Sequence, residues 1–313
     1  MKNNLTVVLL CHDRPNGAIE AVRSILRQTD SNFNFLVSDN SSSKDLQEIL
    51  EADFPSVETI FWNPGYASFF DHFNEIALRI KTKYIVMFHD DDIMKPNYVK
   101  RILEQFKAAP NVAAIGTNFT YSQRSEFANG EIHHPDRKTL LCEGINGTQV
   151  FSDKKAIVLR YLVTDYGGVA AFGSYAYNLE IIKDLHLDYS RGRRFCDVIL
   201  LMDLIDTGPI VWIDEPLIQA SPHDDQMSAH TSVRDYKSFI TAIVRETDEE
   251  INQLHIDEYR FRNLFWILGQ RKRWPIPALK FLVRTAFMLM IYSHSFRRRV
   301  LNRLFRRERT IRW

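Results

Sequence analysis

Strand and helix signals alternate along the first 110 residues of this 313-residue chain. Each of four short apolar runs, typical of a β-strand, is followed by a stretch whose apolar residues recur with helical spacing. The predicted strands are Leu5–Leu10, Phe33–Ser38, Val57–Trp62 and Tyr84–Phe88, and the predicted helices are Ala18–Arg27, Lys44–Ala52, Ser68–Ile80 and Asn97–Ala108. Repeated βαβ units require parallel strands with helices on both faces. The pattern therefore predicts an α/β fold around a mostly parallel central sheet.

From Val112 onward the pattern becomes mixed. Strand-like segments are Val112–Tyr121, Val169–Tyr177 and Ile210–Ile213, and helical ones are Lys154–Val163 and a segment from Cys196 to about Asp206. We expect residues 111–230 to form a second half of one domain, packed on the same sheet as residues 1–110. The three cysteines, Cys11, Cys142 and Cys196, form no CxxC pair, which is typical of a reducing compartment and excludes a disulfide framework.

Three consecutive carboxylates follow the last strand of the first half. The strand Tyr84–Phe88 has no polar alternation, as expected for an inner strand buried on both faces, and it continues into His89-Asp90-Asp91-Asp92. Ligands of open α/β sheets bind at the carboxyl ends of the strands. Crowded carboxylates repel one another unless a hard cation holds them, which favours a divalent ion carrying a phosphorylated substrate. A solvated acidic turn is the alternative. No GxxxxGK[ST] or GxGxxG loop is present to hold phosphates instead.

Six sequence blocks, in order, resemble those of family 2 glycosyltransferases. They are Leu9–Pro15, Val37–Ser42, Asn63-Pro64-Gly65 with Asn74, His89–Asp92, Cys196-Asp197, and Pro216-Leu217 followed by His223, Gln226 and Ser228. The resemblance spans Leu5 to Ser228 and implies the GT-A fold, a Rossmann-like sheet with flanking helices. It also implies a catalytic domain over residues 1–230, with a nucleotide-sugar-binding half (1–110) and an acceptor-side half (111–230), then a helical connector over 231–273.

The resemblance assigns a donor site to the first half. The base and ribose of a nucleotide sugar would lie near Asp13, Asp39 and Asp91. The full expected set is Cys11, Asp13, Arg14, Asp39, Asn63, Asn74, Asp90 and Asp91. Asp92 would bind Mn²⁺ or Mg²⁺, and His223 would close over the metal or the pyrophosphate, although a solvated loop histidine is an equal alternative. The family often has Asp where His89 stands, so the first ligand position falls to Asp90 or is unused.

Asp197 is the expected general base. A family 2 enzyme inverts the anomeric centre by direct displacement, so one carboxylate takes the proton of the attacking hydroxyl and no nucleophilic carboxylate is needed. Asp197 also stands near the expected start of a helix, and the alternative role is a helix cap.

Basic residues gather at the end of the chain. Thirteen Lys and Arg residues but a single acid, Glu308, lie between Gln270 and Trp313, whereas the whole chain has 40 basic and 39 acidic residues. Apolar residues recur there at helical spacing, in the sets Leu279, Leu282, Val283, Ala286, Phe287, Met290 and Phe296, Val300, Leu301, Leu304, Phe305. Residues 274–313 are therefore predicted to form basic amphipathic helices that lie on an anionic membrane surface. Packing on the domain or on a second subunit is the alternative. A nucleic-acid partner is not expected, because the apolar faces would have no role.

Lys280 and Arg284 interrupt the longest apolar stretch, Ile276–Tyr292, so no membrane-spanning helix is expected. The expected function is an inverting, metal-dependent glycosyltransferase, peripheral on the cytoplasmic face of the cell membrane. It would move a sugar, from a UDP-sugar by preference, to a lipid-linked saccharide in surface polysaccharide assembly. The alternatives are a sugar-phosphate nucleotidyltransferase, whose glycine-rich GxGTR loop is absent, and a non-catalytic membrane-associated protein with a degenerate fold of this type.

Overall fold

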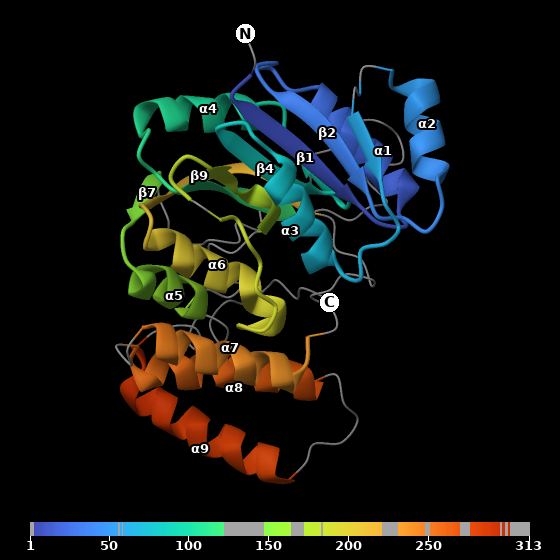
Figure 1. The fold of residues 1–313 in the computed structure, drawn as a ribbon. Helices are drawn as coiled ribbons and strands as arrows, with labels where there is room; N and C mark the ends of the chain where they lie inside the picture. The colour runs from blue at the N-terminus through green and yellow to red at the C-terminus, as the bar shows by residue number, and fades with distance from the viewer. Residues whose placement is uncertain are drawn as a thin grey trace.

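A computed structural model describes residues 3–55, 57, 59–121, 147–163, 172–182, 184–220, 231–247, 251–269, 276–294, 296–297 and 300. The strands in this part of the chain are β1 (Leu5–Cys11), β2 (Asn34–Asp39), β3 (Thr59–Trp62), β4 (Tyr84–His89), β5 (Asp92–Met94), β6 (Ala114–Tyr121), β7 (Thr148–Phe151), β8 (Ala176–Asn178) and β9 (Ile210–Ala220). The helices are α1 (Pro15–Leu26), α2 (Asp45–Asp53), α3 (Phe69–Arg79), α4 (Tyr98–Ala108), α5 (Lys154–Val163), α6 (Cys196–Ile205), α7 (Val233–Glu246), α8 (Gln253–Gly269) and α9 (Ile276–Tyr292) (Figure 1).

The described strands form one mixed sheet in the order β3-β2-β1-β4-β8-β6-β9-β5, with β7 paired to β9. The strands β3, β2, β1 and β4 are parallel neighbours, which confirms the α/β fold with a parallel sheet in the first half. Beyond β4 the sheet changes direction, because β8 is antiparallel to both β4 and β6. All four parallel strands end at the same edge of the sheet, and the candidate donor residues follow those ends.

Two strands differ from the sequence prediction. The structure extends the expected strand Ile210–Ile213 to Ala220, because β9 pairs with β6 through a register shift and with β5 and β7 along the rest of its length. The expected strand Val169–Tyr177 is reduced to β8 at its end, because Phe172–Ser174 form a 3₁₀ turn, and residues 169–171 lie outside the described part.

Both faces of β1 and β4 are buried. On one face, residues such as Val7, Leu9 and Phe88 pack against α1 and α4, and on the other Val8 and Met87 pack against α3 and α6. This burial explains why these strands have continuous apolar runs rather than alternation.

A third apolar cluster joins helices α5, α6, α7 and α8. It contains Val158 and Tyr161 from α5, Val198, Ile199 and Met202 from α6, Phe239, Ile240 and Ile243 from α7, and Ile256 and Tyr259 from α8. Figure 1 shows these helices as layers below the sheet, with α9 farthest from it. Helix α7 therefore packs on α6, which carries Asp197, while α8 packs on α5 and α7.

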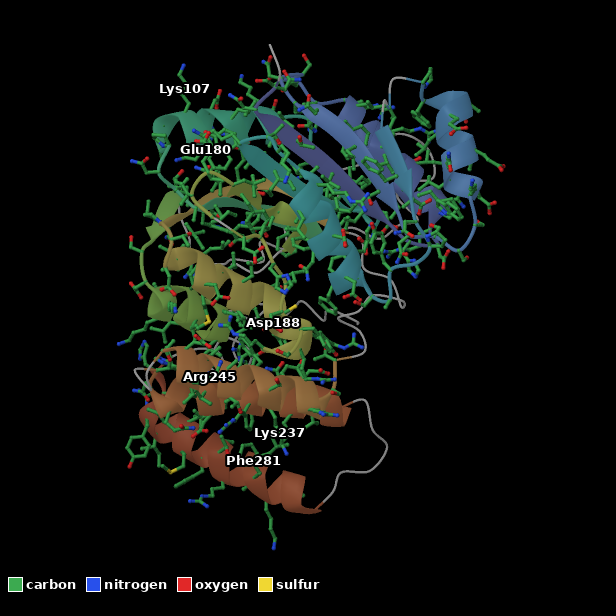
Figure 2. All side chains as sticks on the ribbon, viewed as in Figure 1. Lys107, Glu180, Asp188, Lys237, Arg245 and Phe281 are labelled. Atoms are coloured by element: carbon green, nitrogen blue, oxygen red, sulfur yellow. The ribbon has the colours of Figure 1, made fainter. Side chains whose placement is uncertain are left out.

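Helix α9 packs on α8 along one stripe only. Leu282 and Leu289 are buried, and the hydroxyl of Ser293 donates to Oε2 of Glu258 at 2.9 Å. Phe281 and most other apolar side chains of α9 are exposed, at the end of the molecule away from the sheet (Figure 2). Among the described helices, none has both the length and the apolar character needed to cross a membrane. Most of the second predicted basic helix, from Leu301 onward, lies outside the described residues.

Candidate active site

Three possible metal-ligating side chains meet at the end of β4. Ligand atoms of His89, Asp91 and Asp92 all lie within 4.8 Å of one another, and each residue is partly buried. Gly173 lies over this group: a Cβ at that position would stand 3.2 Å from Oδ2 of Asp92 and 4.0 Å from Cγ of His89. The glycine therefore leaves room beside the carboxylate. One imidazole and two carboxylates form a donor set that fits a divalent cation.

Asp90 has a different role from its neighbours. It is 1% exposed, and its carboxylate accepts a hydrogen bond from the backbone amide of His12 at 2.9 Å and forms an ion pair with Arg14 at 2.5 Å. Arg14 also contacts Oδ2 of Asp91 at 3.1 Å. Burial alone would lower the pKa of Arg14, but Asp90 and Asp91 raise it on balance. Asp90 thus ties the loop after β1 to the end of β4, and His89, rather than Asp90, joins the group of possible ligands.

Serine side chains hold the two carboxylates that follow β1 and β2. Asp13 accepts hydrogen bonds from the backbone amide and the hydroxyl of Ser42 at 2.8 and 2.9 Å. The hydrogen bond from the amide is the main cause that lowers the pKa of Asp13. Asp39 accepts from the amide and hydroxyl of Ser41 at 2.9 and 2.5 Å, while burial raises its pKa. Asp13 has a φ of 49°, a left-handed conformation unusual for a residue other than glycine, and its own amide donates to Ser41.

Asp39 offers one free acceptor atom. The residue is fully buried, and its Oδ2 has no hydrogen-bond partner among the described residues. A buried acceptor without a partner is costly, so its place at the carboxyl end of β2 points to a ligand N–H or O–H. This geometry fits the expected contact with a nucleotide.

The remaining expected donor residues occupy structural positions. Cys11 is buried at the end of β1, where burial raises the pKa of its thiol. Asn63 is exposed and accepts from the amide of Gly65 at 3.0 Å. Asn74 of α3 bonds to both backbone groups of Leu187, at 3.1 and 2.8 Å. Asn74 therefore ties α3 to the segment that leads to α6, and a nucleotide contact by any of the three stays a prediction.

Asp197 lies in the first turn of α6 and is not its N-cap. The N-cap is Phe195, and no side-chain cap hydrogen bond is formed there. Burial raises the pKa of Asp197 to about 7, although the backbone amides of Val198 and of Asp197 itself act in the opposite direction. Its Oδ1 is buried without a hydrogen-bond partner in the described part of the chain. These features fit a proton acceptor better than a cap.

The start of α6 is held by residues that the sequence analysis did not identify. Gly192 and Arg193 both have positive φ, 82° and 56°, and Arg193 pairs with Asp235 of α7 at 2.6 Å. The ring of Phe195 stacks on Phe239, with centroids 4.8 Å apart. The sequence signals the capping box of Ser232 and Asp235 at the start of α7, but not the contact of Asp235 with Arg193.

The expected closing block, His223, Gln226 and Ser228, lies outside the described residues. The predicted role of His223 at the metal or pyrophosphate therefore stays a prediction.

Comparisons with known proteins agree with this arrangement. The model of the family described as glycosyl transferase family 2 matches residues 6–170, more than half of the chain. Among curated proteins no relative matches. The crystal structure of S. aureus TarS 1–349 is similar with a TM-score of 0.58 and 12% identity, covering 96% of this chain and 82% of that one.

The same S. aureus fragment in complex with UDP-GlcNAc gives a TM-score of 0.60 and 11% identity, over 91% of this chain and 80% of that one. Its complex with UDP gives a TM-score of 0.58 and 12% identity, over 91% of this chain and 83% of that one. At such low identity these similarities show the fold alone, and they confirm the expected GT-A fold. The family match begins in β1 and includes β4 with its acidic run, and it shows the family and the activity. The chain belongs to glycosyl transferase family 2 and is a glycosyltransferase.

Proposed function

We propose that this enzyme transfers one sugar, with inversion, from a nucleotide sugar to a lipid-linked saccharide acceptor at the cytoplasmic face of a membrane. The observation that carries this proposal is that the protein holds carboxylates in two different environments. One is the ligand group His89, Asp91 and Asp92 at the end of β4, and the other is Asp197, which is set apart on α6 with a pKa raised to about 7. The first suits a diphosphate with its cation, and the second suits a proton acceptor.

A divalent ion, Mn²⁺ or Mg²⁺, fits the residues at the end of β4, with Asp92 and Asp91 as oxygen ligands. When bound, such an ion neutralises the diphosphate oxygens and so makes the nucleoside diphosphate a better leaving group. Gly173 leaves the space beside Asp92 open. Arg14 forms an ion pair with Asp91 at 3.1 Å, which helps to hold that carboxylate in place.

The donor nucleotide would bind along the ends of β1 and β2. The free Oδ2 of Asp39 suits an N–H of the base, and Asp13, in the loop after β1, is joined to the loop after β2 through Ser41 and Ser42. UDP is favoured as the carrier because it is the commonest in the family, and a UDP-sugar complex of the similar S. aureus fragment is consistent with this choice.

Asp197 would act as the general base. Catalysis is most effective when the pKa of the base lies near the working pH, and burial gives Asp197 that property. The acceptor hydroxyl oxygen forms a bond to the anomeric carbon while Asp197 takes its proton. The bond from that carbon to the diphosphate breaks, and its electron pair leaves with the nucleoside diphosphate. A single displacement of this kind inverts the anomeric centre.

Helix α9 supports the membrane part of the proposal. Leu279, Val283, Phe287 and Met290 recur along one side of the helix and are all exposed, separate from the buried stripe that packs on α8. Lys280 and Arg284 stand beside them. An exposed apolar side with basic neighbours suits an anionic lipid interface, where a lipid-linked acceptor would also lie.

A donor panel tests the proposal. The full chain would be incubated with UDP-, GDP- and dTDP-sugars, membranes that contain lipid-linked saccharides, and Mn²⁺ or Mg²⁺. The expected result is release of a nucleoside diphosphate together with one added sugar on the lipid fraction. In a parallel assay, formation of pyrophosphate from a nucleoside triphosphate and a sugar 1-phosphate would instead indicate a nucleotidyltransferase, and failure to transfer from every donor would contradict the proposal.

A further inference from the structure

His89 occupies a position that distinguishes this chain from the family pattern, in which an acidic residue often stands there. A nitrogen of its ring and one carboxylate oxygen each of Asp91 and Asp92 all lie within 4.8 Å of one another. Asp90, the other residue that could complete an all-oxygen site, is engaged with Arg14 and the amide of His12. The donor set that remains is one nitrogen and two carboxylates.

Packing fixes the imidazole ring of His89. The ring contacts Phe69 of α3 edge-to-face, with centroids 5.4 Å apart, and Gly173 covers its other neighbour, Asp92. A Cβ on Gly173 would stand 4.0 Å from Cγ of His89, so the backbone there approaches the ring closely. A side chain held by such contacts loses little further freedom when it binds an ion.

We propose that His89 is a direct ligand of the active-site ion and makes this site prefer Mn²⁺ and similar transition ions over Mg²⁺. The inference rests on the proposed metal-dependent function and adds the identity of the ion. Mg²⁺ favours an all-oxygen octahedral shell and retains its waters, whereas imidazole nitrogen suits first-row transition ions. Substitution of His89 by Asp should therefore return the site to an all-oxygen set with less discrimination.

The ion bound to the full-length protein can be observed directly. With Mn²⁺ and UDP, electron spin-echo spectroscopy should detect coupling of the manganese spin to an imidazole nitrogen in the wild-type protein. Because His223 is also predicted to lie at the metal, the decisive comparison is made in a His223→Ala background, where the nitrogen coupling should persist with His89 present and vanish in His89→Asp. In His186→Asp, where an exposed histidine in the segment before α6 is changed in the same way, the coupling should persist.

Affinities provide the second readout. Free Mn²⁺, measured by its electron paramagnetic resonance signal during titration with Mg²⁺, gives the preference between the two ions. Loss of groups that support a metal ligand typically costs at least about tenfold in affinity, so His89→Asp should reduce the Mn²⁺-to-Mg²⁺ preference by about tenfold or more. Thermal melting and Mn²⁺-independent UDP binding would show that the variant is folded.

Two outcomes separate this inference from the function on which it rests. If Mn²⁺ binds with UDP but shows no nitrogen coupling, or if His89→Asp leaves the ion preference unchanged, His89 is not a ligand and the proposed transfer reaction is unaffected. If neither ion binds in the presence of UDP, the metal-dependent function itself fails, and with it the role of His89.

Discussion

The guanidinium Nε of Arg193 lies 2.6 Å from Oδ1 of Asp235, which joins the turn before α6 to the first turn of α7. Asp235 is 2% exposed and also accepts from the amide and hydroxyl of Ser232 in the capping box. Arg193 has a left-handed backbone conformation, which persists only where surrounding contacts hold it. Helix α7 therefore holds the turn that directly precedes α6, and so positions the first turn of α6, which carries Asp197.

We predict that Asp235→Asn lowers the transfer rate more than it weakens donor binding. The variant removes the charge opposite Arg193, so the turn before α6 loses its anchor while the donor site at the strand ends is untouched. Turnover, UDP binding and the melting temperature should be measured together. A matched control is Glu180→Gln, which breaks the surface ion pair with Lys83 at 2.6 Å, and it should leave all three values unchanged. Equal loss of donor binding and turnover in Asp235→Asn would contradict the positioning role.

Substitution of the proposed base should separate chemistry from folding. Asp197→Asn should lower the transfer rate by a factor on the order of 10²–10⁴, with UDP-sugar binding retained. The stability change also has a predictable sign. Because the folded-state pKa of Asp197 is raised to about 7 from an unfolded value of 3.8, its ionisation opposes folding as pH rises between these values. The variant should therefore gain stability relative to the wild type between about pH 4 and pH 7. A helix-capping residue would instead lose stability at neutral pH when replaced.

The pH dependence of transfer should report the same group. Only the ionised carboxylate accepts a proton, so kcat should rise as pH increases through about 7 and then level off. The charge of Asp197 also acts on three buried tyrosines, Tyr161, Tyr177 and Tyr259, whose pKa values are raised chiefly by burial and further by that charge. In Asp197→Asn the rise should disappear. A wild-type profile that is flat from pH 5 to pH 8 would exclude Asp197 as the titrating base.

Asp92→Asn should abolish metal-dependent UDP binding and turnover, because the change removes one of the two carboxylates in the ligand group while keeping the shape of the side chain. The fold should persist, since Asp92 is partly exposed at the edge of the sheet. Asp45→Asn, at the surface start of α2, is a suitable control. Normal activity of Asp92→Asn at ordinary Mn²⁺ concentrations would refute the assignment.

Much of the fold could be predicted from local sequence. The strands β1 and β4 were recognisable because burial on both faces requires continuous apolar runs, and the alternation of strands with helices indicated that the first strands are parallel. The full length of β9 could not be predicted, because it depends on pairing with three other strands. A short window of sequence contains no information on such partners.

In the candidate site, too, local sequence predicted some features and not those that depend on distant partners. Motifs located Asp39, Asp92 and Asp197, since each stands at a strand end or helix start. They did not reveal that Asp90 pairs with Arg14, which is 76 residues away in the sequence, or that Asp235 anchors the turn before α6. Both contacts form only when distant segments pack, so the sequence shows the chemistry of each side chain but not its partner.

Helix α9 offers a direct comparison between its two sides. Changing the exposed pair Val283 and Phe287 to Ser should weaken binding to anionic liposomes, while the unfolding free energy changes by no more than about 0.5 kcal/mol, as for surface sites in general. Leu289→Ala, on the buried stripe against α8, should instead cost about 2–5 kcal/mol of stability. Liposome binding should also fall as salt rises, since the Debye length shrinks from about 10 Å at 0.1 M to about 3 Å at 1 M. Failure of the full-length protein to bind anionic liposomes at low salt would contradict a membrane-binding role for this side of α9.

The stereochemical course of transfer, followed by nuclear magnetic resonance with the wild type and Asp197→Asn, distinguishes a single displacement from a double one. The sugar of an α-linked donor should appear β-linked in the lipid fraction, with one nucleoside diphosphate released per sugar. Asp197→Asn should also lower the rate of this transfer by a factor on the order of 10²–10⁴. Retention of the anomeric configuration, or an undiminished rate in the variant, would contradict the account of Asp197 as the single base of an inverting displacement.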